Sequence, residues 1–178
     1  MREVEFLGIL INENGILMPL DKREKVFNFR QPTKFKELKQ FIGMCEFIHN
    51  HVKDFSSIMK PLHIILEGYT KATRNKKLIW SNEAEAALKT IQIAISECAT
   101  LHFMDDKAPI TLQTDASDYG MGAYLFQLVD GMERQVALIS KTFDKTQLKW
   151  SFRFTTPLIN YVILSETFHL HYKQSIKI

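Results

Sequence analysis

Residues 110–127, ITLQTDASDYGMGAYLFQ, constrain the fold and the chemistry of this chain more than any other segment. A short β-prone run, ITLQT, delivers one carboxylate, Asp115, and small residues with a Gly-x-Gly turn (Gly120, Gly122) follow it. A second apolar run, AYLF, then returns the chain. An acid held on a strand and fenced by small residues leaves room for a metal ion beside it. The segment therefore predicts a β-hairpin that presents an acid to a cation.

The charge of the chain is unevenly distributed. The 178 residues are 46% hydrophobic, which suits one or two small globular units. Residues 1–80 carry 14 Lys and Arg against 9 Asp and Glu, whereas residues 81–150 carry 6 against 10. A basic front half followed by an acidic middle predicts a polyanion contact first and a cation-holding site later. Ordinary scatter of charge along a chain explains the same numbers.

Cysteine usage and hydropathy indicate the compartment. Cys45 and Cys98 lie far apart and form neither a disulfide framework nor a paired zinc spacing. The N-terminus lacks a signal-peptide core, and no apolar run approaches the ~20 residues that a membrane helix needs. We therefore expect a soluble intracellular protein, cytoplasmic or nuclear, without a membrane partner.

Turn residues predict two β-hairpins. The first has a strand over residues 4–11, the polar turn NENG over 12–15 and a short return strand over 16–18. In the second half of the chain, the DG pair at 130–131 predicts a two-residue turn, and a third strand is expected over 136–140 after the hairpin around Asp115.

Apolar residues at helical spacing predict the helices. One helix is expected over residues 34–48, and a second pattern starts near Val52. Pro61 is expected to begin another short helix. A further helix is expected over 82–97 with Ser81 as its N-cap. The Phe residues of the first 55 positions share this spacing, which favours core packing over base stacking.

Cys45 and His49 are four residues apart on one predicted helix, with His51 nearby. A metal site there would lack a fourth ligand, so the pattern favours helix-surface and core residues.

Taken in order, the segments resemble the polymerase polyprotein of LTR retrotransposons of the gypsy class. EFLGILINENGI resembles the primer-grip hairpin of a reverse transcriptase, and FKELKQFIGMCEFIHNHVKDFSSIMKPLHIIL resembles the thumb signature. IWSNEAEAALKTIQIAI resembles the tether, TDASDYGMGA the first ribonuclease H hairpin, and DGMERQVALISKTFDKTQLKWS its continuation. The resemblance implies five segments: a primer-grip hairpin (1–20), a helical thumb (21–68), a linker and tether helix (69–108), ribonuclease H-like strands 1–3 (109–150) and a divergent tail (151–178).

The resemblance also implies a nucleic-acid interface. A thumb grips duplex phosphate without reading bases, so it carries exposed lysines. The expected contacts are Phe6, Leu7 and Gly8 of the primer grip, followed by Lys34, Lys36, Lys39 and Lys53 of the thumb, with Lys60 further along. A solvated helix face is the alternative interpretation of these lysines.

Asp115 matches the first ligand position of the family's magnesium site. Cleavage of a phosphodiester by two metal ions ~4 Å apart needs several carboxylates, and hard oxygen ligands suit Mg²⁺. Asp118 is not a family ligand and is expected to be a turn residue. The adjacent pair Asp105 and Asp106 lies downstream of the primer grip, so it is expected to be a solvated turn and not the polymerase aspartates.

The family pattern fails after Trp150. Thr156 or Pro157 occupies the position of the second acid, and Glu166 comes about ten residues too late. We interpret the loss as a frameshift, a missed splice junction or decay of an old element. The encoding DNA, read in its other frames past Trp150, tests the frameshift version, which is wrong if no frame restores the acid.

These patterns predict an α+β fold: an N-terminal β-hairpin, a helical thumb, a truncated ribonuclease H-like sheet of three antiparallel strands, and a C-terminal segment without a predicted structure. The parent activities implied are RNA-directed DNA synthesis and cleavage of RNA–DNA hybrids. For this chain, a vestigial Asp115 predicts no tight Mg²⁺ binding, little or no catalysis and residual binding to the backbone of an RNA–DNA hybrid or DNA duplex. A retained non-catalytic host protein, acting as an interaction or nucleic-acid-binding module, is the alternative.

Overall fold

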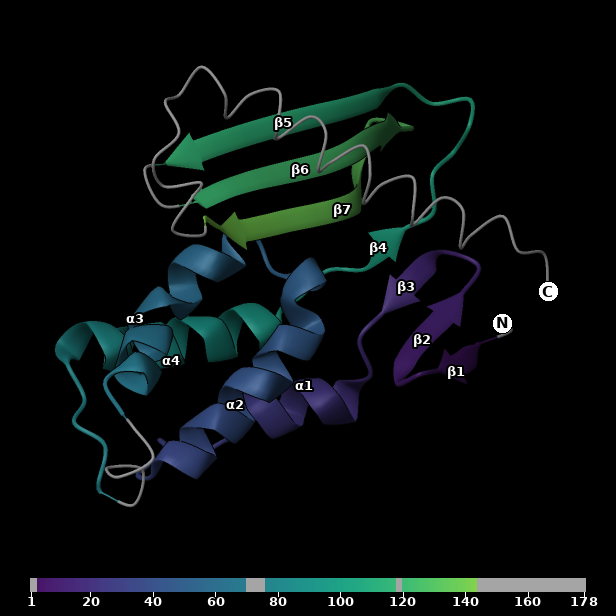
Figure 1. Ribbon diagram of the computed structural model, residues 1–178. Coiled ribbons are helices and arrows are strands. Elements are labelled where there is room, and N and C mark those ends of the chain that lie inside the picture. Colours follow the sequence, from purple (N-terminus) through teal and green to yellow (C-terminus); the bar gives the residue numbers. More distant parts are fainter. Residues whose placement is uncertain (1–2, 70–75, 118–119, 144–178) are drawn as a thin grey trace. The chain divides into compact units, whose positions relative to one another are not determined.

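The structure, a computed structural model, describes residues 3–69, 76–117 and 120–143. The chain divides into two compact units, Met1–Phe103 and Met104–Ile178. The expected features of residues 144–178, including the divergent tail and Glu166, lie outside the described residues, as does Asp118. Mixed helices and antiparallel sheets confirm the predicted α+β class (Figure 1).

A small antiparallel sheet opens the first unit. Its strand order within the described residues is β1-β2-β3-β4, formed by β1 (Val4–Phe6), β2 (Ile9–Asn12), β3 (Gly15–Leu17) and β4 (Leu101–His102). The predicted single strand over residues 4–11 is wrong, because the chain reverses at Leu7 and Gly8. Both residues have positive φ, 49° and 79°, the combination that a tight two-residue hairpin turn requires.

The described part of this unit contains four α-helices: α1 (Leu20–Phe27), α2 (Phe35–Ile48), α3 (Phe55–Glu67) and α4 (Asn82–Ser96). The predictions of α2 and α4 are confirmed, and Ser81 Oγ accepts a hydrogen bond from Ala84 N, as an N-cap should. Helix α1 was not predicted from the sequence. The separate helix expected from Pro61 is also wrong, because Pro61 lies inside α3. Because proline has no N–H, the carbonyl four residues before Pro61, that of Ser57, has no helical donor. Ser57 is exposed, so water can donate to this carbonyl instead.

A single hydrophobic core joins these helices. It contains Leu38 and Phe41 of α2, Met59 of α3 and Ile91 of α4, each completely buried. Helix α4 packs against α1 and α3, so the expected tether helix shares the core of the expected thumb (Figure 1). This packing makes the first unit one body from its hairpin to β4.

The segment that leads into α4 is also docked. Trp80 Nε1 donates to the Pro32 carbonyl oxygen at 2.9 Å, and Leu78 N donates to the Thr33 carbonyl oxygen at 2.9 Å. Leu78 is 4% exposed. The start of α2 and the approach to α4 therefore support each other.

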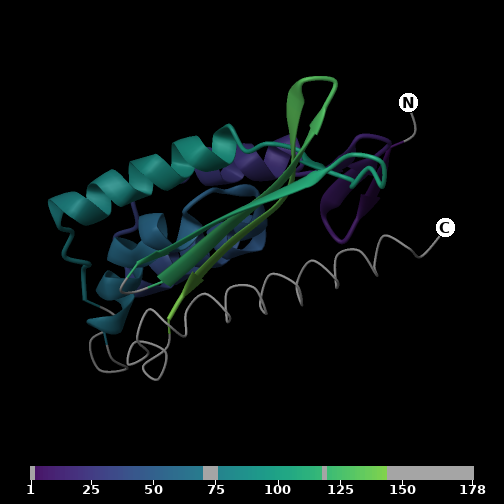
Figure 2. The ribbon, with the colours of Figure 1, turned by 90° about the horizontal axis from the view of Figure 1, so that it is seen from above.

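The second unit is built on an antiparallel sheet of strand order β5-β6-β7 in the described residues, with β5 (Ile110–Ser117), β6 (Gly120–Val129) and β7 (Met132–Thr142). The predicted DG turn joins β6 to β7, with φ of 54° at Asp130 and 75° at Gly131. These two strands form a long twisted hairpin (Figure 2). The expected Gly-x-Gly turn is wrong, because Gly120 and Gly122 lie inside β6, paired with Ser117 and Asp115.

Candidate functional site

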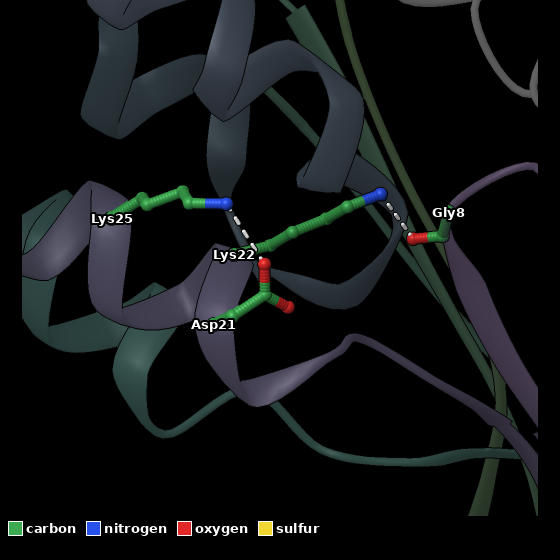
Figure 3. Close-up of polar contacts among 4 residues, drawn as sticks. All are labelled: Gly8, Asp21, Lys22 and Lys25. Atoms are coloured by element: carbon green, nitrogen blue, oxygen red, sulfur yellow. Dashed lines mark hydrogen bonds and ion pairs between the residues drawn. The ribbon is translucent and has the colours of Figure 1, made fainter.

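The turn at Leu7 and Gly8, here called the Leu7/Gly8 turn, projects from the small sheet. Leu7 is 79% exposed and Phe6 is 58% exposed. The Gly8 carbonyl oxygen accepts a hydrogen bond from Lys22 Nζ at 2.6 Å, across 14 residues of sequence (Figure 3). The turn is therefore attached to α1, while its apolar side chains remain accessible.

Lys22 also joins the turn to α2. Its Nζ lies 4.7 Å from the centroid of the Phe47 ring, a cation–π arrangement. A Cβ atom added at Gly8 would lie 1.8 Å from Lys22 Nζ and 3.5 Å from the Phe47 ring, so the turn, the lysine and the ring are in close contact. Phe47 is 51% exposed, which makes it an exception to the expected core role of the early Phe residues.

One side of α2 is solvent-exposed along its whole length. Residues at i, i+3, i+4, i+7 and i+11 share a helical face, and here they are Lys36, Lys39, Gln40, Gly43 and Phe47, which we call the exposed α2 stripe. The opposite face carries the buried residues Leu38, Phe41, Ile42, Cys45 and Ile48. A Cβ added at Gly43 would meet nothing within 4 Å, so a ligand can approach the helix backbone there.

Lys34 and Lys53 lie outside this stripe. Exposed Lys34 is the N-cap residue of α2, where the Glu37 carboxylate accepts hydrogen bonds from Thr33 N, Thr33 Oγ1 and Lys34 N. These bonds, above all that from the Thr33 backbone, lower the pKa of Glu37. Lys53 is exposed in the turn before α3. The structure therefore places Phe6, Leu7, Gly8, Lys36 and Lys39 on elements that Lys22 joins, with Lys34 at the N-cap of α2 and Lys53 in the turn before α3.

Sequence reasoning missed Gln40, Gly43, Phe47 and Lys22 as members of this surface. The helical spacing of the first three with Lys36 could have found them. No sequence signal points to Lys22, since its partners are 14 and 25 positions away.

Asp115 lies in β5 and is solvent-exposed. Its cross-strand partner is Gly122, which in turn pairs with Ser140 of β7. The next residues on the same face are Gln113, Tyr124 and Leu138. The described rows beside Asp115 thus hold no second carboxylate.

Two other described acids of this unit, Asp105 and Glu133, have hydrogen-bond partners elsewhere. The Gln127 side chain holds the backbone of Asp105, because its oxygen accepts from Asp105 N and its nitrogen donates to the Asp105 carbonyl oxygen. Gln127 is five residues along β6 from Gly122, which is roughly 17 Å at strand rise. Asp105 Oδ1 accepts from Lys107 N, which confirms a turn at this position. The Glu133 carboxylate accepts from the Tyr124 hydroxyl, and burial followed by this bond raises the pKa of Tyr124 to about 12.

Across the described ranges, no group of three or more His, Cys, Asp or Glu side chains is arranged to hold a metal ion. Mg²⁺ needs a near-octahedral set of oxygen ligands, and the described strand residues beside Asp115 bring no second carboxylate to it. The other carboxylate on the described strands of this sheet, that of Glu133 in β7, accepts from the Tyr124 hydroxyl.

Cys45, His49 and His51 belong to no group of side chains that could hold a metal ion among the residues that the structure describes. Cys45 is fully buried in the core, and burial raises the pKa of its thiol to about 12. His49 Nδ1 lies 2.6 Å from the Glu46 carbonyl oxygen. His51 is buried with Nδ1 3.2 Å from the Ala99 carbonyl oxygen, and burial lowers its pKa. These positions confirm the core and surface interpretation.

The fold and the residue patterns together define a class of protein. Residues 80–178 match the model of the RNase H-like domain found in reverse transcriptase. The chain belongs to this family. The matched range includes residues 151–178, where the sequence pattern predicts divergence.

Particular relatives extend the similarity to the first unit. The chain is 30% identical over 160 residues to the retrovirus-related Pol polyprotein from transposon opus of Drosophila melanogaster, covering 82% of this chain and 15% of that protein. It is 31% identical over 150 residues to the transposon Tf2-3 polyprotein of Schizosaccharomyces pombe, covering 84% of this chain and 11% of that protein. The chain thus spans a small part of the length of these relatives.

Solved structures agree in fold. The foamy viral protease-reverse transcriptase in complex with RNA/DNA hybrid matches with a TM-score of 0.72 and 25% identity, covering 93% of this chain and 22% of that one. The same enzyme in complex with dsDNA also matches with a TM-score of 0.72, covering 96% and 34%.

Among the helices that the structure describes, none combines the length and the apolar character needed to cross a bilayer.

Proposed function

We propose that this chain supplies the primer-grip turn, the thumb and the opening strands of the RNase H-like domain of a gypsy-class retrotransposon polyprotein. In that role it binds the backbone of an RNA–DNA hybrid or a DNA duplex without reading sequence, in the cytoplasm or nucleus. The observation that carries the proposal is the exposed α2 stripe, which runs from two lysines to Phe47 and meets the Leu7/Gly8 turn through Lys22.

The chemistry of the exposed α2 stripe suits a nucleic-acid backbone. Lys36 and Lys39 offer ammonium groups to phosphates, and such contacts position a duplex but carry no sequence information. The bare backbone at Gly43 permits close approach, and the half-exposed Phe47 ring offers an apolar surface to sugars or bases. Relatives of the same fold include a reverse transcriptase in complex with RNA/DNA hybrid, which supports this ligand class.

We further propose that the chain alone does not cleave hybrids. Asp115 is exposed, and among the described residues the rows beside it hold no carboxylate, whereas two magnesium ions need several.

Binding to a labelled RNA–DNA hybrid at several salt concentrations tests the proposed interface. Wild type should bind with an affinity that falls steeply with salt. Lys36→Ala/Lys39→Ala should weaken binding and lower the slope of log affinity against log salt by about two, because each lysine that pairs with a phosphate contributes about one. Lys89→Ala is the matched control, since Lys89 is exposed on α4. Equal slopes for wild type and the double variant would exclude the stripe as the binding surface.

A further inference from the structure

We propose that Lys22 is a positioning residue that fixes the Leu7/Gly8 turn against Phe47, so that the turn and the exposed α2 stripe form one continuous nucleic-acid-binding surface. The purpose assigned to this contact rests on the proposed function. The existence of the contact does not depend on the proposed function, because it can be tested in the protein without nucleic acid.

Lys22 makes two contacts that bridge three elements. From α1, its ammonium donates to the carbonyl oxygen of Gly8 at 2.6 Å in the turn between β1 and β2 (Figure 3). The same nitrogen lies 4.7 Å from the centroid of the Phe47 ring on α2. Both partners lie far from Lys22 in sequence, and the fold alone brings them together. One side chain therefore connects the sheet of the expected primer grip to the helix of the expected thumb.

The turn leaves an acceptor open for such a contact. In a two-residue hairpin turn the carbonyl of the second turn residue points away from the ladder of β1 and β2, so it is available to a donor from elsewhere in the fold. Lys22 is half-buried and supplies a charge-assisted bond, the stronger kind. Leu7 at a positive φ of 49° is unfavourable for a branched apolar side chain, so the turn conformation depends on support from its surroundings.

Lys25 shows what an ordinary surface lysine does on the same helix. Its Nζ pairs with Asp21 Oδ2 at 2.9 Å, four residues away, and both side chains are largely exposed (Figure 3). That pair stays within α1 and connects nothing else. Lys25 is therefore a matched control for Lys22.

A direct phosphate contact is the competing role for Lys22. The two roles differ in salt dependence, because removal of a phosphate ligand lowers the slope of log affinity against log salt by about one. Removal of a positioning residue weakens binding at every salt concentration and leaves the slope unchanged.

The experiment combines NMR of the free protein with hybrid binding for Lys22→Met, Lys22→Arg and Lys25→Met. In wild type we expect the Lys22 ε-methylene protons to be shifted upfield by the Phe47 ring, and Lys22→Met should shift the Gly8 carbonyl carbon. With hybrid, we expect Lys22→Met to bind about three- to tenfold more weakly with an unchanged salt slope. Lys22→Arg should restore most of the affinity. Lys25→Met should change neither the Lys22 ε-methylene signal nor the Gly8 carbonyl signal.

Two results would overturn the inference: an unchanged Gly8 carbonyl carbon in Lys22→Met, or a salt slope lowered by about one, which would make Lys22 a phosphate ligand. If wild type binds no hybrid, the proposed function fails. The Gly8 and Lys22 signals of the free protein then still decide whether the contact exists.

Discussion

The two units differ in what supports their surfaces. Among the largest fully buried side chains, the first unit supplies apolar residues from all four of its described helices together with Pro32, whereas the second supplies the amide of Gln127. The cluster of buried residues that includes Leu125 in the second unit comprises Leu125, Val136 and Ala137. The binding surface that we propose therefore lies on a well-packed helical core, while Asp115 is exposed on a sheet whose buried side chains include Met121, Leu125, Phe126 and Leu138. Packing of this kind gives a surface a fixed shape.

The largest expected effect tests the core of the first unit. Phe41 is completely buried and its ring lies 5.3 Å from that of Phe29. Phe41→Ala should lower the free energy of unfolding by about 3–5 kcal/mol, because it removes a large apolar side chain and leaves a cavity. Urea unfolding followed by circular dichroism measures this. Ile79→Ala, at a position 83% exposed, should change stability by less than about 0.5 kcal/mol. Similar losses for both variants would contradict the packing described.

Acid should weaken the first unit through His51. Burial, the largest cause, lowers the pKa of His51 below its ordinary value of 6.5, and the nearby His49 and Arg23 add to the shift. The unfolded chain then binds the proton more readily, so stability is full above pH 6.5 and is lost as pH falls below it. Urea midpoints at pH 7.5 and 5.5 measure the loss. His51→Gln should flatten this dependence, and an equally steep dependence in the variant would assign it to another group.

A smaller effect is expected at the start of α4. Ser81 Oγ accepts from Ala84 N at 3.2 Å, so Ser81→Ala should cost about 1 kcal/mol of stability, as loss of an N-cap typically does. Ser81→Asp keeps an acceptor at this position and should retain stability. The thermal midpoints of the three proteins check this, and a loss in the Asp variant as large as in the Ala variant would argue against capping.

Local patterns in the sequence were sufficient for some elements. Helices α2 and α4 each bury one regular apolar stripe, and their spacing could be read directly. Helix α1 buries Val26 as its one buried residue, so no stripe marked it. The reversal at Leu7 and Gly8 was missed because leucine gives no turn signal, and its φ of 49° depends on contacts made elsewhere.

The candidate site also has a part that the sequence could predict and a part that it could not. Exposure of Lys36 and Lys39 follows from the helical pattern that buries Leu38 and Phe41, so the sequence could predict it. The link from Gly8 through Lys22 to Phe47 joins three elements by tertiary packing, which no local pattern encodes. Asp115 was placed on its strand from sequence, but the two glycines after it lie in β6, since small residues serve a crowded strand pair as well as a turn.

Cleavage of a labelled RNA–DNA hybrid in Mg²⁺ or Mn²⁺, compared between wild type and Asp115→Asn, tests the central contrast most directly. The contrast that we propose is that the first unit binds nucleic acid, while Asp115 has no second carboxylate among its described cross-strand neighbours. We expect no cleavage above background from either protein and equal hybrid affinity for both. Cleavage by wild type that disappears in Asp115→Asn would contradict the account.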